Sequence, residues 1–410
     1  MFIKLNIMKR LLSLLLLVNL SLTIIAQESV QWRGENSDGK YNETGLLKAW
    51  PENGPTLLWH FDDLGDGHSS AAATADKIYT AGTLDEKGYV FALSHDGKLI
   101  WKSEIGKSWT DSWNGVRTTP LVIKDKLYII SSFGKLVCMN TKDGKIIWSV
   151  DVFETYNGRN IKWGITENLL VDGDKIFLTA GGVESNVIAL NRNNGELIWK
   201  CAGNGEKSAY NSPALIIHNN RKILVTQTEN SILGIDPING KLLWSYEHIN
   251  EWSVHPNTPL YHNGFVYVVS GYGCGGVLLK LSDDGNTISK VWTNTSLDNQ
   301  MGGVIYLDGR LYGAGHNNRK LICLDWETGE ELFFTKSMQR GNTIYADGLL
   351  YCYDERGKVL LIKPEENSFN VISEFQVPYG ENQHWAHLVI NNKRLYVRHG
   401  TSLMVYDIAN

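Results

Sequence analysis

The 410-residue sequence has few cysteines, no large excess of charge of one sign, and no long apolar run beyond residue 25. Its five cysteines are odd in number and widely spaced, which argues against a disulfide framework or a zinc motif. The formal net charge is −5 and the basic residues are scattered, so nucleic acid is not expected as a partner. The sequence also lacks long capped helical stripes, a nucleophile elbow, a phosphate loop and a calcium loop. The common sequence signals of an enzyme or a metal site are therefore missing.

The N-terminal segment predicts export. A basic pair, Lys9-Arg10, precedes the apolar run from Leu11 to Ile25, and Ala26 is followed by polar residues. This order predicts a signal peptide over residues 1–26, because an apolar run of about fifteen residues is short for a membrane span. The first cysteine is Cys138, so none stands at the predicted cleavage site and no lipid anchor is expected. We therefore predict a soluble monomer in the periplasm or outside the cell, with no transmembrane segment after cleavage.

One pattern returns along nearly the whole chain. It consists of an apolar run, a polar turn that ends in glycine, and a second apolar run that ends in tryptophan four residues later. Residues 135–150 read KLVCMNTKDGKIIWSV, and residues 231–245 read SILGIDPINGKLLWS. The fifth copy is looser, because Trp292 comes seven residues after Gly285, and the sixth and seventh copies end in phenylalanine. The aromatic markers, spaced 41 to 51 residues apart, are Trp59, Trp101, Trp148, Trp199, Trp244, Trp292, Phe333 and Phe375.

A repeat of this length with four short strands is typical of a β-propeller blade. Alternating apolar residues and glycine or asparagine turns favour strands over helices. The eighth copy begins at residues 403–407 and lacks its glycine–tryptophan half, which stands instead at residues 54–59. We predict an all-β fold over residues 55–410: an eight-bladed β-propeller of four-stranded antiparallel blades, whose last blade is closed by the N-terminal strand around Trp59. Residues 27–54 are expected to form an arm packed on the ring.

The repeated residues have a structural explanation. A glycine at the turn, such as Gly144, suits a position with positive φ. The following tryptophan is expected to bury its ring between neighbouring blades, where the indole N–H still finds a carbonyl oxygen. We therefore assign all eight aromatic markers to the scaffold.

Candidate binding residues lie in the connections between the blades. In a propeller these connections gather on one face around the central channel, and here they are long and hold tryptophans that the repeat does not need. Aromatic rings beside Asn, Gln, His and Arg suit a sugar, a peptide segment or a flat cofactor, while packing of the loops on one another is the alternative. No catalytic or metal-binding residue is assigned. The candidate ligand-binding residues are His68, Trp113, Arg117, Trp163, Tyr210, Trp252, His255, Gln300, Arg340, His384 and Trp385.

The segments ALNRNNGELIW, GIDPINGKLLW and CLDWETGEELF resemble the repeat of the PQQ (pyrroloquinoline quinone)-type β-propeller family, whose pattern is Ala-x-Asp-x-x-x-Gly-x-x-x-Trp. The resemblance covers about residues 55–410 and implies the propeller fold. It also implies one of two kinds of function, because the family includes quinoprotein alcohol dehydrogenases, which bind PQQ and calcium, and non-enzymatic BamB-like propellers, which bind proteins. The dehydrogenases stack PQQ against a disulfide of two adjacent cysteines, and no two cysteines are adjacent here. BamB-like proteins are lipoproteins, and this sequence has no lipobox.

We therefore expect an exported, non-catalytic propeller that needs no cofactor and binds a cell-envelope protein or a glycan through its loop face. A PQQ-dependent quinoprotein-like oxidoreductase is the alternative, and a carbohydrate-active enzyme is the second alternative. Bound quinone or calcium would favour the first alternative, and turnover of a polysaccharide would favour the second.

Overall fold

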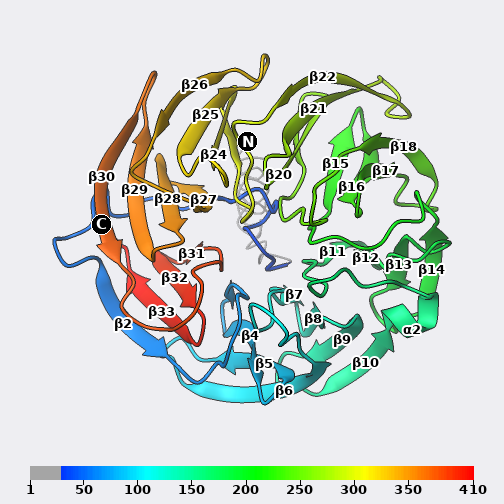
Figure 1. Ribbon diagram of the computed structural model, residues 1–410. Helices are drawn as coiled ribbons and strands as arrows, with labels where there is room; N and C mark the ends of the chain where they lie inside the picture. Colours follow the sequence, from blue (N-terminus) through cyan, green and yellow to red (C-terminus); the bar gives the residue numbers. More distant parts are fainter. Residues whose placement is uncertain (1–28) are drawn as a thin grey trace, which may run out of the picture.

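The computed structural model describes residues 29–410, which form eight four-stranded blades in a ring around a central channel (Figure 1). The signal peptide predicted over residues 1–26 lies outside the described residues. Within each blade, neighbouring strands are antiparallel, and in blades one to seven they follow the chain from the channel to the rim. The predicted all-β, eight-bladed architecture is confirmed. No helix among the described residues is long and apolar enough to cross a membrane.

The strands of the first four blades follow in chain order, and a short helix, α2 (Val152–Tyr156), stands after the second blade. Blade one consists of β3 (Ala72–Ala73), β4 (Ile78–Leu84), β5 (Lys87–Leu93) and β6 (Leu99–Lys107). Blade two consists of β7 (Leu121–Ile123), β8 (Lys126–Ile130), β9 (Lys135–Asn140) and β10 (Ile146–Asp151). Blade three consists of β11 (Leu170–Asp172), β12 (Lys175–Leu178), β13 (Val187–Asn191) and β14 (Leu197–Cys201). Blade four consists of β15 (Ala214–His218), β16 (Arg221–Gln227), β17 (Ser231–Ile235) and β18 (Leu242–Glu247).

The remaining blades repeat this order. Blade five consists of β19 (Leu260–His262), β20 (Phe265–Ser270), β21 (Gly275–Leu281) and β22 (Ile288–Asn294). Blade six consists of β23 (Ile305–Leu307), β24 (Arg310–Ala314), β25 (Leu321–Asp325) and β26 (Glu331–Thr335). Blade seven consists of β27 (Gly341–Ala346), β28 (Leu349–Asp354), β29 (Lys358–Pro364) and β30 (Phe369–Gln376). Blade eight consists of β31 (Val389–Asn391), β32 (Arg394–His399), β33 (Ser402–Asp407) and the N-terminal β2 (Thr56–Phe61).

The N-terminal strand closes the ring, as predicted. β2 pairs antiparallel with β33, and Trp59 lies opposite Val405. The indole Nε1 of Trp59 donates to the carbonyl oxygen of His95 in blade one at 2.9 Å. Hydrogen bonds between the first and last strands of the ring leave no open blade at the junction, which removes an edge that could pair with another chain.

In blades two, three, four and six the polar turn is shaped by an Asp or Asn side chain. The Asp236 side chain accepts a hydrogen bond from the backbone N–H of Ile238 at 2.9 Å, and Asn140 accepts one from Lys142 at 2.8 Å. Such local bonds from Asp and Asn to the backbone stabilise tight turns. The repeated acidic or amide residue is therefore explained by turn geometry.

The turn glycine and the tryptophan of the preceding blade fit each other. Gly144 of blade two has φ 72°, and a Cβ at this position would lie 2.5 Å from the Trp101 ring of blade one. The Trp101 indole donates to the carbonyl oxygen of Thr141, in the same turn, at 3.2 Å. One turn thus supplies both the space and the acceptor for its neighbour's tryptophan. The same indole-to-carbonyl bond to the next blade is made by Trp148, Trp199 and Trp292.

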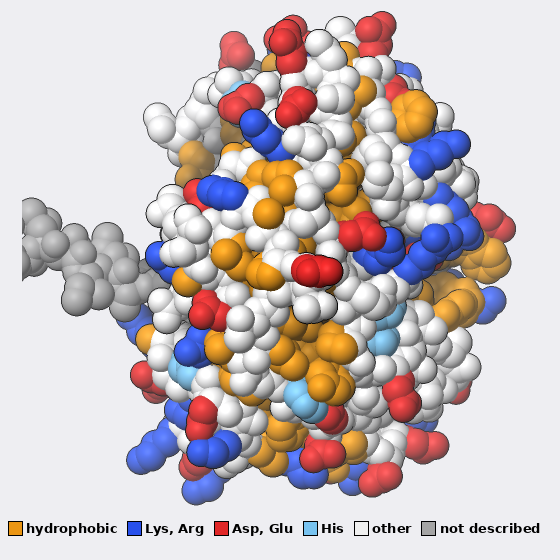
Figure 2. All heavy atoms as spheres, turned by 90° about the vertical axis from the view of Figure 1, so that its left-hand side faces the viewer, with side chains coloured by type: hydrophobic (Ala, Val, Ile, Leu, Met, Phe, Trp, Pro, Cys, Tyr) orange, Lys and Arg blue, Asp and Glu red, His pale blue; other side chains and the backbone are white. Residues whose placement is uncertain are grey.

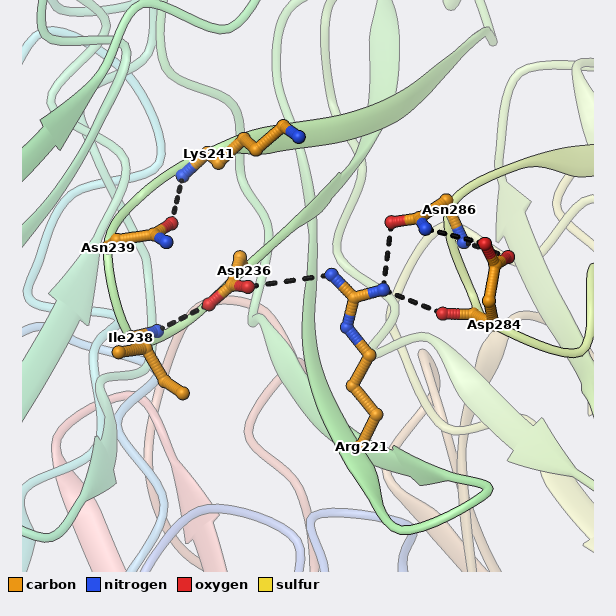
Figure 3. A network of polar contacts seen from close by, with 7 residues as sticks. All are labelled: Arg221, Asp236, Ile238, Asn239, Lys241, Asp284 and Asn286. Atoms are coloured by element: carbon orange, nitrogen blue, oxygen red, sulfur yellow. Dashed lines mark hydrogen bonds and ion pairs between the residues drawn. The ribbon is translucent and has the colours of Figure 1, made fainter.

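Trp244 is the exception, because its buried Nε1 has no hydrogen-bond partner. The next turn, in blade five, places Gly285 against Ile223 instead of against Trp244. Arg221 links the two blades in its place, donating to the carbonyl oxygen of Asp284 at 2.6 Å and to Oδ1 of Asn286 at 2.8 Å (Figure 3). The irregular spacing of the fifth repeat therefore coincides with a polar link between the blades.

Residues 29–54 form an arm that starts inside the ring and ends at its rim. Val30 forms a bridge with Val122 of the inner strand of blade two, and β1 (Lys40–Tyr41) pairs in parallel with β27. Trp50 is buried against blade seven, where its Nε1 donates to the backbone. Figure 1 shows the arm leaving the middle of the ring past blade seven before it enters β2.

The outer surface is mixed in charge. On the side that carries β30 and β2, both Lys or Arg and Asp or Glu side chains are present, and small apolar patches lie between them (Figure 2).

Candidate ligand-binding site on the loop face

A cavity of about 500 Å³ lies at one end of the channel, on the face where the connections between blades gather. Each of the eight connections from an outer strand to the next inner strand contributes lining residues. All the predicted binding residues except His255 and His384 line this loop-face cavity. The fold therefore gathers residues that are far apart in sequence around one space. The predicted residues that line it are His68, Trp113, Arg117, Trp163, Tyr210, Trp252, Gln300, Arg340 and Trp385.

Four tryptophans form an aromatic wall, in the order Trp385, Trp113, Trp163 and Trp252. Successive ring centroids along this order are 6.1, 5.4 and 6.0 Å apart, with interplanar angles of 39°, 68° and 58°. Tilted and edge-to-face contacts of this kind are favourable for aromatic rings. Trp113 is nevertheless 46% exposed and Trp252 is 37% exposed. The rings therefore pack on one another and still present apolar surface at the mouth of the cavity.

Arg117 holds the aromatic wall in place. Its guanidinium donates to the carbonyl oxygens of Trp113 at 2.8 Å, Trp163 at 3.0 Å and Ser112 at 3.3 Å, and to the hydroxyl of Tyr210. These acceptors belong to three successive connections between blades. A planar guanidinium can serve several acceptors at once, which a single ammonium cannot do in the same geometry. Arg117 is thus a positioning residue whose hydrogen-bonding capacity is largely used within the protein.

The loop that carries Trp113 is also docked on the loop that carries His68. The backbone N–H of His68 donates to the carbonyl oxygen of Val116 at 2.8 Å. Gly115 has φ 115°, and a Cβ there would lie 2.4 Å from the backbone of Asp66, so the close approach requires glycine. Trp113 itself has φ 45°, which is unusual for a bulky residue. Backbone conformations of this kind cost about 1–3 kcal/mol and cluster at functional sites.

The opposite side of the cavity is a polar wall of Tyr272, Gln300, His316, Arg340 and Glu355. Nε2 of Gln300 donates to the Tyr272 hydroxyl at 2.6 Å. Nε of Arg340 donates to the carbonyl oxygen of His316 at 3.0 Å, and its guanidinium lies 3.8 Å from the Glu355 carboxylate. The single carboxylate of the lining residues is therefore paired with a cation.

Buried Asp298 supports the polar wall from behind. Its carboxylate accepts hydrogen bonds from the backbone N–H groups of Gly273 at 2.9 Å, His316 at 2.7 Å and Asn317 at 3.1 Å. These donors lie in the connections between the second and third strands of blades five and six. Asp298 fixes the two connections relative to each other, as Arg117 does for the aromatic wall.

Three residues of the polar wall were not found from the sequence: Tyr272, His316 and Glu355. They lie in connections between the second and third strands of a blade, whereas the prediction considered only the connections between blades. In an antiparallel blade both kinds of connection return to the same face. The sequence could therefore have indicated these residues, because every second connection along the chain returns to the loop face.

The N-terminal arm forms the floor of the cavity. Trp32 lines it and meets the His387 ring edge to face, with centroids 4.7 Å apart. The neighbouring Arg33 is buried and donates to the carbonyl oxygens of Val304 at 3.1 Å and Thr343 at 3.3 Å. Arg33 also lies 3.3 Å from Nδ1 of His387. A buried cation thus ties the arm to the inner strands of the ring.

A second cavity, of about 400 Å³, is also lined by the arm. It is lined by Gln31, by residues 35–38 and by residues of inner strands such as Tyr261 and Tyr306. Because inner strands run away from the loop face, this cavity lies nearer the opposite end of the channel. The arm therefore lines both cavities.

The expectation that His255 and His384 face the binding site is not met. Nε2 of His255 bonds to the carbonyl oxygen of Glu229 at 3.2 Å. His384 stacks on His399 with centroids 3.6 Å apart, and its Nδ1 bonds to the hydroxyl of Tyr353 at 2.6 Å. Both histidines are thus held by other loops. Over residues 29–410, no group of three His, Cys, Asp or Glu side chains is placed to hold a metal ion.

The loop-face cavity carries little net charge at neutral pH. Burial lowers the pKa of His68 and of His387 well below the ordinary value, so both imidazoles are uncharged. Burial also lowers the pKa of His316, and the Arg340 guanidinium adds to this effect. The lining is therefore mainly apolar and hydrogen-bonding, and the exposed Lys162 ammonium lies 4.7 Å from the Trp163 ring centroid and 5.5 Å from that of Trp252.

Curated relatives and solved structures are similar to this chain. It is 25% identical over 211 residues to the outer membrane protein assembly factor BamB of Kangiella koreensis, a match that covers 50% of this chain and 49% of that protein. It is 23% identical over 151 residues to the quinoprotein alcohol dehydrogenase PedH of Pseudomonas putida, covering 35% of this chain and 24% of that protein. The chain thus spans about half the length of the BamB relative that it matches.

Two solved structures share the propeller fold. BamB from Moraxella catarrhalis gives a TM-score of 0.62 at 16% identity and covers 86% of this chain and 99% of that one. A europium-containing methanol dehydrogenase gives a TM-score of 0.67 at 12% identity and covers 92% of this chain and 91% of that one. Because both identities are low, these likenesses show the fold and not the function.

The family assignment comes from the repeats themselves. The sequence family described as "Outer membrane protein assembly factor BamB" matches residues 86–335, which is more than half of the 410 residues. The matched part runs from the third strand of blade one to the end of blade six. The resemblance to PQQ-type propellers that the sequence indicated is thereby confirmed. The chain belongs to the BamB-like family of PQQ-type repeat β-propellers.

Proposed function

We propose that this protein is an exported, non-catalytic binding propeller that holds a protein segment or a glycan of the cell envelope in its loop-face cavity. The observation that carries this proposal is the aromatic wall, in which Trp113 and Trp252 remain 46% and 37% exposed. Large exposed rings at the rim of a concave site are typical of binding surfaces. The hydrogen bonds of Arg117 fix the wall before any ligand arrives, which lowers the entropy cost of binding.

The lining residues support binding better than catalysis. Glycoside hydrolysis normally needs two carboxyl groups that flank the scissile bond. The loop-face cavity is lined by one carboxylate, Glu355, and the Arg340 guanidinium lies beside it. The lining histidines His68 and His387 are uncharged because burial lowers their pKa values, so they are poor proton donors at neutral pH. We therefore favour a binding function over that of a carbohydrate-active enzyme.

We also propose that the protein works without PQQ and calcium. The residues fit these groups poorly, because the five cysteines are free and no two are adjacent to form the disulfide against which the quinone would stack. Calorimetric titration with PQQ, with and without calcium, tests this point. Saturable, calcium-dependent binding would contradict the proposal and would direct work to dye-linked alcohol oxidation.

Export remains part of the proposal. It rests on the basic and apolar N-terminal segment of the sequence and is supported by the similarity to proteins named for outer membrane protein assembly. Fractionation of cells that express the full chain, followed by N-terminal sequencing, tests it. Retention of an uncleaved chain in the cytoplasm would contradict it.

The binding proposal is tested with two ligand panels on the purified protein. One panel contains fluorescent peptides from outer membrane proteins, and the other contains labelled hexasaccharides. We expect members of at least one panel to bind, and Trp113→Ala with Trp252→Ala to weaken that binding by about tenfold or more, which is 1.4 kcal/mol. The control is Ile238→Ala, a truncation of a 75% exposed apolar side chain in the blade-four turn. No binding, or equal effects of both variants, would contradict the proposed site.

A further inference from the structure

Lys162 is a cation at the mouth of the loop-face cavity, beside the aromatic wall. Its side chain is exposed, and its ammonium lies 4.7 Å from the Trp163 ring centroid and 5.5 Å from that of Trp252. It forms no ion pair with any residue of the described chain. The two indole rings attract the ammonium and hold it over the aromatic wall. Its N–H groups are therefore open to a ligand that enters the cavity.

Arg340, in the polar wall, is a second cation whose hydrogen-bonding capacity is only partly used. Its Nε donates to the carbonyl oxygen of His316 at 3.0 Å, which orients the guanidinium. Its Nη1 lies 3.8 Å from the Glu355 carboxylate, which is too far for a hydrogen bond. Neither Nη group is buried, and neither donates a hydrogen bond to any residue among 29–410. The outer edge of this guanidinium can therefore bind a carboxylate through two parallel hydrogen bonds.

The two cations stand on opposite sides of the channel. Lys162 lies in the connection between blades two and three, and Arg340 lies in the connection between blades six and seven. In a ring of eight blades these two connections are opposite each other (Figure 1). A ligand that crosses the cavity therefore meets one cation beside the rings of Trp163 and Trp252, and a second cation at the polar wall.

We propose that the loop-face cavity binds an acidic protein segment. One carboxylate of the segment pairs with Lys162, a second pairs with Arg340, and an apolar side chain between them packs on the aromatic wall. This inference rests on the proposed binding function of the same cavity and names the ligand class. The protein as a whole has a formal charge of −5. Its net charge disfavours an acidic ligand, so the attraction depends on these two local cations.

The lining favours a protein segment over an acidic glycan. It combines Trp, Tyr and Arg side chains, such as Trp252, Tyr272 and Arg340, which are the residue types that dominate the binding energy of protein–protein interfaces. Glu355 lies beside Arg340 and would repel a polyuronate, which carries a carboxylate on every sugar ring. A protein segment can instead place a backbone N–H against Glu355. Two separated carboxylates thus match the site better than a uniform polyanion.

The experiment measures the fluorescence anisotropy of short labelled peptides, with blocked ends, on the purified protein. In the probe peptides two Glu residues flank a Phe at several spacings, and matched peptides carry Gln in place of Glu. Oligogalacturonate serves as the acidic glycan probe. We expect at least one Glu peptide to bind about tenfold or more tightly than its Gln counterpart. Raising the NaCl concentration from about 50 to about 500 mM should weaken this binding, because salt screens the exposed charges.

Three variants locate the carboxylates of the bound peptide. Lys162→Gln should weaken binding of the Glu peptide about two- to fivefold, as expected for an exposed ion pair. Arg340→Gln should weaken it about tenfold or more, because hydrogen bonds to a charged group are lost. The matched control is Lys142→Gln, which removes the same charge from an exposed lysine in the blade-two turn on the opposite face, and it should bind like the unchanged protein.

Four results would overturn this inference. Equal affinities of the Glu and Gln peptides would refute an acidic ligand but leave the binding propeller standing. Binding of oligogalacturonate without binding of any peptide would replace the protein segment by an acidic glycan. Equal effects of Lys162→Gln and Lys142→Gln would refute the proposed pairing, and because Lys162 is exposed this comparison holds even if Arg340→Gln lowers stability. Lack of binding by every peptide and glycan probe would contradict both this inference and the proposed function.

Discussion

The fit between a turn glycine and its neighbour's tryptophan makes a measurable prediction. In blade two, Gly144→Ala adds a methyl group at a φ of 72°, where it would lie 2.5 Å from the Trp101 ring. Gly173→Ala is the matched control, because Gly173 also has a positive φ, 57°, but no atom lies within 4 Å of the added methyl. The two variants share the backbone strain and differ in the clash with tryptophan.

The expected magnitudes follow from these two terms. A left-handed backbone costs an L-residue about 1–2 kcal/mol, and overpacking a filled site costs about 1–3 kcal/mol more. We expect Gly144→Ala to lower the free energy of unfolding by about 2–5 kcal/mol, and Gly173→Ala by about 1–2 kcal/mol. Urea unfolding followed by circular dichroism and by tryptophan fluorescence measures the difference as a lower midpoint for Gly144→Ala.

Equal midpoints for the two variants would refute this reasoning. They would show that the Trp101 ring moves aside freely and that the glycine and tryptophan do not lock the blades together. A second arm uses Trp101→Leu, which removes most of the clashing ring. In the Trp101→Leu protein, Gly144→Ala should lower the free energy of unfolding by no more than Gly173→Ala does, since only the backbone strain remains.

Three further predictions concern single side chains. In Arg117→Lys, the lysine cannot donate to the carbonyl oxygens of Trp113 and Trp163 together, so amide hydrogens of the two loops should exchange faster. Unchanged exchange rates would show that other contacts hold the aromatic wall. Burial raises the pKa of Glu167 to about 8, above the 4.5 of a free carboxyl, so the free energy of unfolding should fall as pH rises from about 4.5 to 8. Glu167→Gln should remove this pH dependence in urea titrations at several pH values. An identical pH dependence in the variant would contradict the assignment. Arg33→Met should release the arm to limited proteolysis near residues 34–45, whereas protection equal to that of the unchanged protein would argue against its anchoring role.

Much of the candidate site could be predicted because the repeat sorts the tryptophans into two classes. Trp148 and its equivalents stand at the fixed position after the turn glycine, so Trp113, Trp163 and Trp385 stood out as tryptophans without a scaffold role. Their placement on one face followed from blade topology. His255 and His384 have the same sequence context, but their rings are held by neighbouring loops. Sequence proximity to a binding loop does not give the direction of a side chain.

The sequence by itself determined the ring. A period of 41 to 51 residues, a polar turn and an aromatic residue after it specify most blades locally, and the split eighth repeat specifies closure by β2. These features are readable because each blade packs on its immediate neighbours in the chain. Only the tertiary structure decided what the channel holds. The arm beneath the cavity, anchored by Arg33, and the carboxylate of Asp298 behind the polar wall act through contacts between residues that no repeat relates. Such contacts depend on the closed ring, which brings unrelated loops to a common axis.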